Sequence, residues 1–348
     1  MKLNAFDFFC GAGGLTRGLL DSGIEVIAGF DCDKECCESY EYNNPGVKFI
    51  AKDIRDVTLA ELRRLAQKGS FKETIFVGCA PCQPFSQQRR SNKHMNDATL
   101  LSEFGRLVAL AKPGIVLIEN VPGITRLPGF STFRRFLKLL TQNNYKFAYD
   151  IIDAKRYGIP QTRRRLVLIA ARGTAPPLPK PKHGPTLLPF KTVRQTISHF
   201  PVLAAGECHP NVPNHVAASI TPMNIERLKH TPLNGGDRRS WPDNLRLDCH
   251  KGDYNGHTDV YGRMAWDTPA PALTGRCHSI SNGRYGHPEQ NRAISLREAA
   301  ALQTFPDGYV FFGSNTHIAR QIGNAVPVRL AKELGKSLRI TFLEKDIV

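Results

Sequence analysis

Long apolar runs are missing from this chain, and so is a leader of charged residues followed by apolar ones. No stretch approaches the length needed to span a bilayer. The first residues, 1–6, run directly into an expected strand, so we expect neither a secretion signal nor a regulatory segment before it. We therefore expect an intracellular, cytoplasmic protein without a membrane anchor.

Cysteine lacks the regular spacing of a disulfide-rich secreted domain or of a zinc finger. The chain has 9 cysteines, an odd number, scattered from Cys10 to Cys277. Cys79 and Cys82 form a C-x-x-C pair, but no second pair follows at finger spacing, and the nearby prolines indicate a loop rather than a thioredoxin-type helix. We expect reduced thiols and no metal site.

Acidic residues are fewer than basic residues in this chain. The chain has 31 Asp and Glu against 47 Lys and Arg, which gives a formal net charge of +16 and a pI near 9.6. This balance favours a polyanionic partner, with nucleic acid as the first candidate, although a simply basic enzyme has the same composition. With 348 residues, 41% of them hydrophobic, the chain has material for one large core and a smaller appended domain.

Short β-rich runs alternate with amphipathic stretches in the first half of the chain. This alternation is typical of an α/β fold with a doubly wound, mostly parallel sheet. We expect strands at residues 5–9, 25–30, 47–50, 74–77, 115–118 and 166–170, and helices at 15–21, 59–67, 100–111 and 132–142.

A proline-rich segment, 174–182, predicts a linker after this first half. The content of Pro, Gly, Asn and His then stays high to about residue 291, which indicates a loop-rich second domain with short strands. Later helical stretches at 296–304 and 328–340 would rejoin the first core. We therefore expect a first domain at 1–185, completed by 316–348, a second domain at 186–290, and a connecting segment at 291–315.

A glycine-rich turn follows the first expected strand, an order that lets backbone approach a nucleotide closely. The turn lacks the Gly-Lys-Ser/Thr of a P-loop, and Thr16 stands where the dinucleotide motif has its last glycine. Asp31, after the second strand, is placed to bind ribose hydroxyls, and Asp53, after the third, to bind an adenine amine, unless both are surface turn residues. Adenosine without a pyrophosphate clamp points to S-adenosylmethionine.

Candidate catalytic residues lie at the ends of three further strands. Cys82 follows the fourth strand in a proline-stiffened turn, a position that suits a nucleophilic thiol. Glu119 follows the fifth strand, so in a parallel sheet it emerges at the same edge as Cys82. Arg163 and Arg165 precede the sixth, and strand alternation sends both towards one crevice. The alternatives are a helix-start carboxylate and a solvated charge run.

Taken together, these blocks resemble those of the DNA cytosine-5 methyltransferase family. They occur in the family's order over almost the whole chain, and only about residues 186–260 are unmatched. Phe8 and Cys10 depart slightly, because the family more often has Leu and Ala there. The matching blocks are 7–15, Pro81-Cys82-Gln83, Glu119-Asn120-Val121, Gln161-x-Arg163-x-Arg165, 297–306 and 321–327.

The resemblance implies methylation of carbon 5 of a cytosine within a specific duplex DNA sequence. Cys82 would add to carbon 6 of a flipped-out base, and protonated Glu119 would donate to ring nitrogen 3. Arg165 would hold the exocyclic oxygen of the base, and Arg163 would help order the covalent adduct. The family also implies a bacterial restriction-modification setting, in which methylation protects DNA from a partner endonuclease.

The resemblance extends to cofactor and DNA contacts. The basic segment 87–94 would be a mobile loop that closes over DNA, and the second domain, 186–290, would recognise the target. Base-reading residues stay unassigned, because sequence does not separate base contacts from phosphate contacts. The cofactor site would contain Phe9, stacked on adenine, and Gly11, Gly13, Asp31, Asp53, Leu100, Asn324 and Val326.

Two other functions stay open. One is a tRNA cytosine-5 methyltransferase of the same family. The other is a catalytically inactive DNA-binding protein, because affinity for phosphate needs only positive charge. The middle segment favours duplex DNA, and the presence of Cys82, Glu119 and Arg165 together favours an enzyme. A nicotinamide-linked oxidoreductase is a more distant alternative. We expect a monomer.

Overall fold

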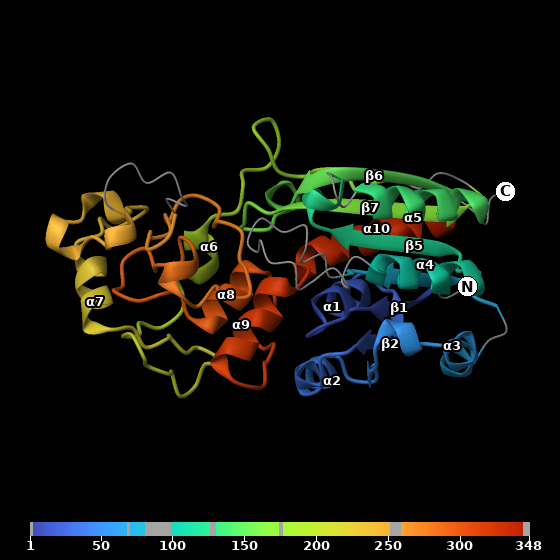
Figure 1. The fold of residues 1–348 in the computed structure, drawn as a ribbon, viewed down its shortest axis with the longest axis horizontal. Coiled ribbons are helices and arrows are strands. Elements are labelled where there is room, and N and C mark those ends of the chain that lie inside the picture. The colour runs from blue at the N-terminus through green and yellow to red at the C-terminus, as the bar shows by residue number, and fades with distance from the viewer. Residues whose placement is uncertain are drawn as a thin grey trace. The chain divides into compact units, whose positions relative to one another are not determined.

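The chain forms two compact units (Figure 1). The computed structural model describes residues 3–67, 70–80, 99–125, 130–173, 177–250 and 259–343. The first unit comprises 1–157, 164–181 and 326–348, and the second comprises 158–163 and 182–325.

A seven-stranded sheet forms the first unit, in the order β3-β2-β1-β4-β5-β7-β6. Neighbours from β3 to β5 are parallel, whereas β7 runs antiparallel to both β5 and β6. The doubly wound, mostly parallel sheet expected from the sequence is confirmed. The strands are β1 (Asn4–Phe8), β2 (Glu25–Asp31), β3 (Lys48–Ala51), β4 (Thr74–Gly78), β5 (Ile115–Asn120), β6 (Tyr145–Asp153) and β7 (Arg164–Arg172).

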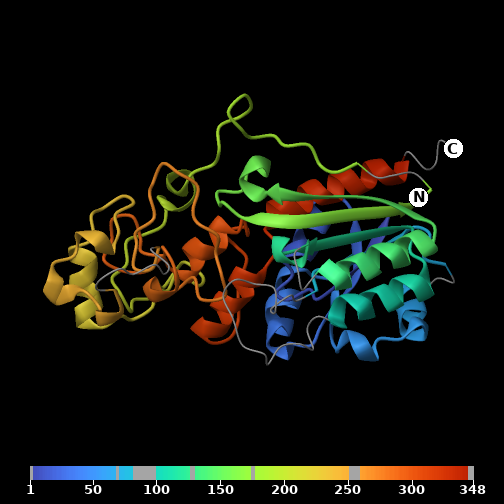
Figure 2. The same ribbon diagram turned by 45° about the horizontal axis from the view of Figure 1, so that its top comes forward.

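Helices cover both faces of this sheet, with α10 on one side and α4 and α5 on the other (Figure 2). α1 packs so closely on α10 that a Cβ at Gly18 would lie 2.3 Å from Ala331 Cβ. The helices of this unit are α1 (Gly14–Asp21), α2 (Cys37–Asn43), α3 (Leu59–Ala66), α4 (Leu100–Ala111), α5 (Phe130–Gln142) and α10 (Val328–Leu343), with 3₁₀ turns η1 (Lys34–Cys36), η2 (Ile54–Asp56), η5 (Pro122–Thr125) and η6 (Ala154–Tyr157).

Loops and short helices make up the second unit. In its described part, pairing outside helices is limited to isolated bridges such as Cys208 with Val216, rather than the short strands that we expected. None of the helices that the structure describes is both long and apolar enough to cross a membrane. The helices are α6 (Val193–Ile197), α7 (Pro222–Lys229), α8 (Leu296–Leu302) and α9 (Asn315–Asn324), with η7 (Arg238–Ser240), η8 (Asp243–Leu245), η9 (Asp248–His250) and η10 (Ile280–Asn282).

The division of the chain differs from the expected one after residue 290. Residues 291–325 fall in the second unit, whereas we expected 291–315 to connect the domains and 316–348 to complete the first. The physical reason is helix packing, since α8 contacts both α6 and α9 within the second unit. Of the expected C-terminal completion, the part from residue 326 onwards belongs to the first unit.

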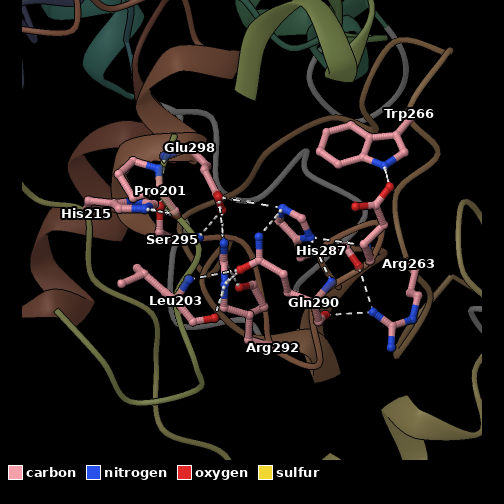
Figure 3. Close-up of polar contacts among 12 residues, drawn as sticks. Pro201, Leu203, His215, Arg263, Trp266, His287, Gln290, Arg292, Ser295 and Glu298 are labelled. Atoms are coloured by element: carbon pink, nitrogen blue, oxygen red, sulfur yellow. Dashed lines mark hydrogen bonds and ion pairs between the residues drawn. The ribbon is translucent and has the colours of Figure 1, made fainter. Parts of the chain in front are cut away.

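A buried polar network holds the loops of the second unit together (Figure 3). Arg292 and Glu298 form a fully buried ion pair with 2.7 Å between Nη2 and Oε1. Glu298 and Ser295 form the capping box of α8, and His215 lies 2.8 Å from the Ser295 hydroxyl. Arg263 donates to the carbonyl oxygens of four residues, among them His287 at 2.9 Å. Buried guanidinium groups thus replace the sheet ladders that a loop-rich unit lacks.

Candidate active site and cofactor site

The turn after β1 is a backbone cradle open to one side. Phe9 adopts a left-handed conformation with φ 63°, and Gly11 and Gly13 have φ 50° and 84°. The amides of Phe9 and Cys10 both donate to the Phe30 carbonyl, which bends the chain away from β1. A Cβ added at Gly11 would meet nothing within 4 Å. The backbone at Gly11 therefore has open space beside it among the described residues.

Asp31, the last residue of β2, links the cradle to the neighbouring strand. Its Oδ2 accepts a hydrogen bond from the Gly11 amide at 2.8 Å, and its Oδ1 accepts one from the Asp33 amide at 2.9 Å. Burial raises the pKa of Asp31, and backbone amide donors, those of Asp33, Gly11 and Cys32, oppose that rise. A carboxylate has about four lone-pair positions, so Asp31 keeps acceptor capacity for a ribose hydroxyl group.

Asp53 caps the η2 turn beyond β3. Its Oδ1 accepts from the Arg55 amide at 2.9 Å, and the Arg55 guanidinium donates to both carboxylate oxygens, at 2.8 Å from Nε and 2.6 Å from Nη2. These hydrogen bonds lower the pKa of Asp53. The carboxylate is therefore an anion of fixed orientation. Arg55 was not singled out from the sequence, although its position two residues after a capping aspartate was the available signal.

A buried carboxyl group lies beneath the cradle. Asp7 Oδ2 accepts from the Thr16 hydroxyl at 2.7 Å, and that hydroxyl also lies 2.9 Å from the Tyr40 hydroxyl. Asp7 Oδ1 has no hydrogen-bond partner among the residues that the structure describes. Burial raises the pKa of Asp7 to about 7, and the charge of Asp31 adds to the rise.

Glu119 and Arg165 meet at the edge where β5 ends and β7 begins. Because β7 runs antiparallel to β5, Glu119 pairs with Val167 and Arg165 lies within reach of it. Arg165 Nε is 3.0 Å from Glu119 Oε1, and the two side chains are 16% and 8% exposed. Burial lowers the pKa of Arg165, and the Glu119 charge opposes this. This carboxyl group and guanidinium group form one ion pair.

The end of β4 is tied to the end of β5. Asn120 Nδ2 donates to the Ala80 carbonyl at 3.1 Å, and its Oδ1 accepts from the Val121 amide. Burial and the nearby Glu119 charge raise the pKa of Cys79 well above its ordinary value, so this thiol stays protonated. The predicted nucleophile, Cys82, and the predicted closing loop at 87–94 lie outside the described residues.

Arg163 has different partners from Arg165. It precedes β7, so strand alternation does not apply to it. It belongs to the second unit, where its guanidinium donates to the carbonyls of Leu273 (2.8 Å), Gly323 (3.2 Å) and Ala325 (3.3 Å).

Three other predicted cofactor residues lie at element ends. Leu100 is the first residue of α4 and packs against the core of the first unit. Asn324 is the exposed last residue of α9 in the second unit. Val326 belongs to the first unit and is 5% exposed.

The sheet order, the glycine cradle and the acidic residue ending β2 define the fold of the S-adenosylmethionine-dependent methyltransferases.

The comparison with protein families defines the chain further. Residues 3–339 match the model of the C-5 cytosine-specific DNA methylases. The chain belongs to this family and is a DNA cytosine-5 methyltransferase.

Curated relatives match along nearly the whole chain. The type II methylase M.HgiDII of Herpetosiphon aurantiacus is 41% identical over 343 residues, covering 97% of this chain and 95% of that protein. The type II methyltransferase M1.HphI of Haemophilus parahaemolyticus is 31% identical, covering 97% and 87%. Among solved structures, a prophage-encoded Escherichia coli protein has a TM-score of 0.75 at 20% identity, covering 98% of this chain and 100% of its own. That last likeness shows the fold.

Proposed function

We propose that this enzyme methylates carbon 5 of cytosine within one specific duplex DNA sequence, as the protective partner of a restriction endonuclease. Family membership and the names of the type II relatives support this proposal. The observation that carries the chemistry is the Glu119–Arg165 ion pair, which lies beside the strand end that leads to Cys82.

Three side chains have distinct tasks in the proposed reaction. The Cys82 thiolate adds to carbon 6 of the flipped-out cytosine, which makes carbon 5 nucleophilic. Glu119 must first take up a proton, and in that protonated form it donates to ring nitrogen 3, while Arg165 orients Glu119 and holds the exocyclic oxygen of the base. After methyl transfer, loss of the carbon 5 proton and of Cys82 restores the aromatic ring. Arg163 would help order the covalent adduct, and its guanidinium group is held by the carbonyl oxygens of Leu273 and Gly323.

The cradle residues fit S-adenosylmethionine, which supplies an electrophilic methyl group when bound. Asp31 retains acceptor capacity for a ribose hydroxyl, and the partly buried Phe9, in the turn after β1, would stack on adenine. Asp53 retains acceptor capacity for the adenine amine. Gly11 leaves open space beside the backbone, and Gly13, Leu100, Asn324 and Val326 would be further cofactor contacts.

The second unit, in this proposal, recognises the DNA target. The net charge of +16 supports binding to phosphate, but several arginines of this unit do not contribute, because they are buried on carbonyl or carboxylate partners. Arg263, Arg292 and Arg297 are each 0% exposed. The predictions of a monomer and of a cytoplasmic location stay predictions.

One experiment tests the proposed reaction and its substrate together. Purified enzyme is incubated with labelled S-adenosylmethionine and either duplex DNA or tRNA, and the DNA is then sequenced after bisulfite treatment. We expect label in DNA and protected cytosines at one recurring sequence. Transfer to tRNA alone would replace the proposal with the RNA alternative, and absence of transfer to both would contradict it.

A second experiment tests the covalent step and the restriction partner. Duplex DNA carrying 5-fluorocytosine at the target site retains fluorine where the proton must leave, so the adduct should persist and mass spectrometry should locate it on Cys82. Host DNA lacking the enzyme should become sensitive to an endonuclease that cuts the same sequence. An adduct at another residue would contradict the covalent role of Cys82. Unchanged sensitivity to every endonuclease from the same host would contradict the proposed restriction partner.

A further inference from the structure

An arginine of α4 holds the η2 turn in place. Arg106 Nη2 donates to the carbonyl oxygens of Ile54 (3.1 Å), Arg55 (3.4 Å) and Val57 (3.2 Å). Arg106 Nε donates to Glu103 Oε2 at 2.7 Å, one helical turn earlier. The guanidinium group is thus oriented by its own helix and bound to the backbone of a segment about fifty residues away in the sequence.

The η2 turn has little internal support of its own. Its backbone hydrogen bonds are those from Asp56 to Asp53 at 3.0 Å and from Val57 to Ile54 at 3.3 Å. The last carbonyls of any helix lack donors within the helix, and a single 3₁₀ turn consists almost entirely of such ends. Arg106 supplies a charged donor to these carbonyls. Without it, the backbone of the turn would depend on water, on these two bonds and on the Asp53 side-chain cap.

The orientation of this turn decides where the Asp53 carboxylate has a free acceptor. A carboxylate has about four lone-pair positions. The amide, Nε and Nη2 of Arg55 occupy three of them, two on Oδ1 and one on Oδ2. One position on Oδ2 is left for a ligand. Because every one of these contacts comes from within the turn, a rotation of the turn backbone redirects that position.

We propose that Arg106 is a positioning residue for the cofactor, which fixes the η2 turn so that the free acceptor of Asp53 faces the adenine amine. This inference rests on the proposed adenine contact of Asp53. The sequence contained no motif for it, because Arg106 lies on a helix and its partners are backbone atoms. The same helix begins with Leu100, another predicted cofactor residue, so α4 would serve the adenosine site at two points.

Calorimetric titration with two ligands tests the inference. The ligands are S-adenosylhomocysteine and an analogue whose purine lacks the 6-amino group. Arg106→Met should weaken binding of S-adenosylhomocysteine about tenfold, the effect of one misdirected hydrogen bond, and should leave binding of the analogue unchanged. The preference of the wild type for the amine should therefore disappear. The KM for S-adenosylmethionine should rise more than the turnover number falls, and Arg106→Lys should restore part of the preference.

A matched control separates this effect from loss of charge or of stability. Arg63→Met removes an exposed arginine from α3 of the same unit and should bind both ligands as the wild type does. Thermal unfolding checks that each variant is folded. If Arg106→Met does not fold, Glu103→Gln carries the same comparison, because it removes the carboxylate that orients the guanidinium. A reduced preference in that variant supports the inference, and an unchanged one contradicts it.

The outcomes distinguish this inference from the proposed function. Equal weakening of both ligands by Arg106→Met would mean a merely structural arginine and would overturn the inference alone. If Asp53→Ala bound both ligands as the wild type does, the adenine contact would be wrong and the inference would fall with it, while methyl transfer stood. Wild-type enzyme that bound neither ligand would refute the proposed function itself.

Discussion

Replacing Asp7 with asparagine removes a buried ionisable group from the first unit with almost no change of shape. The asparagine carbonyl can accept the bond from the Thr16 hydroxyl, as Asp7 Oδ2 does at 2.7 Å. Its amide group takes the place of Oδ1, which has no hydrogen-bond partner in the described part of the chain. Asp7→Asn therefore imitates the protonated acid at every pH, and the comparison with wild type isolates one titration.

The expected size follows from the shift of the Asp7 pKa. Burial raises this pKa from 3.8 to about 7, so between these values the folded chain binds a proton that the unfolded chain has lost. The stability that Asp7 contributes is complete below pH 3.8 and is lost as the pH rises through about 7. At 1.36 kcal/mol for each pKa unit, the whole loss is about 4 kcal/mol. About 3 kcal/mol of it falls between pH 5 and pH 8.

Urea unfolding of wild type and Asp7→Asn at pH 5 and pH 8 measures this difference. We expect Asp7→Asn to be more stable than wild type by about 1.5 kcal/mol at pH 5 and by about 4 kcal/mol at pH 8, so that the difference grows by about 3 kcal/mol between the two pH values. Asp56→Asn, at an exposed position of η2, is the control and should follow the wild type. Parallel pH profiles for wild type and Asp7→Asn would refute the argument that this carboxyl group is protonated when folded.

Further variants test the active site and the second unit. Cys82→Ser should abolish methyl transfer in the labelled assay while S-adenosylhomocysteine still binds in calorimetry, and substantial remaining turnover would rule out covalent catalysis. Glu119→Gln should lower the turnover number at least about a hundredfold with little change in DNA affinity, and an unaltered pH dependence of the rate would argue against its proton transfer. Arg292→Met should destabilise the second unit by about 3–5 kcal/mol, because the buried Glu298 carboxylate loses its ion-pair partner. Thermal unfolding measures the loss, and the double variant Arg292→Met/Glu298→Gln, which also removes the buried charge, should lose less stability than the single variant. DNA affinity measured by fluorescence anisotropy should fall steeply as salt rises, and a flat response would contradict binding through phosphates.

Periodicity predicted the central part of the sheet well, because those strands are buried on both sides. β1, β4 and β5 are apolar runs bounded by turn residues, and each matches its expected range within two residues at either end. β6, one of the two edge strands, was missed because its burial alternates irregularly along nine residues. Its antiparallel pairing with β7 has no local signature, since direction depends on the path of the chain between the two strands.

The positions of candidate residues were predictable where they stand at a strand end, and the roles given to these residues stay predictions. Glu119 and Asp31 follow directly from strand boundaries and lie at the same edge of the sheet. Arg165 was correctly placed beside that edge, but its pairing with Glu119 needed the antiparallel direction of β7. Arg106 was out of reach, because its partners are carbonyl oxygens, which every residue offers equally.

The path of the chain limits how freely the two units can be exchanged between related enzymes. The chain passes from one unit to the other after residues 157, 163, 181 and 325. A protease that cuts after residue 181 therefore releases no independent module: the N-terminal fragment keeps 158–163 and the C-terminal fragment keeps α10, which packs on α1. Recombination that transfers a new specificity must therefore exchange residues 158–163 together with 182–325. Otherwise segments from two different parent enzymes would have to pack against each other within one unit.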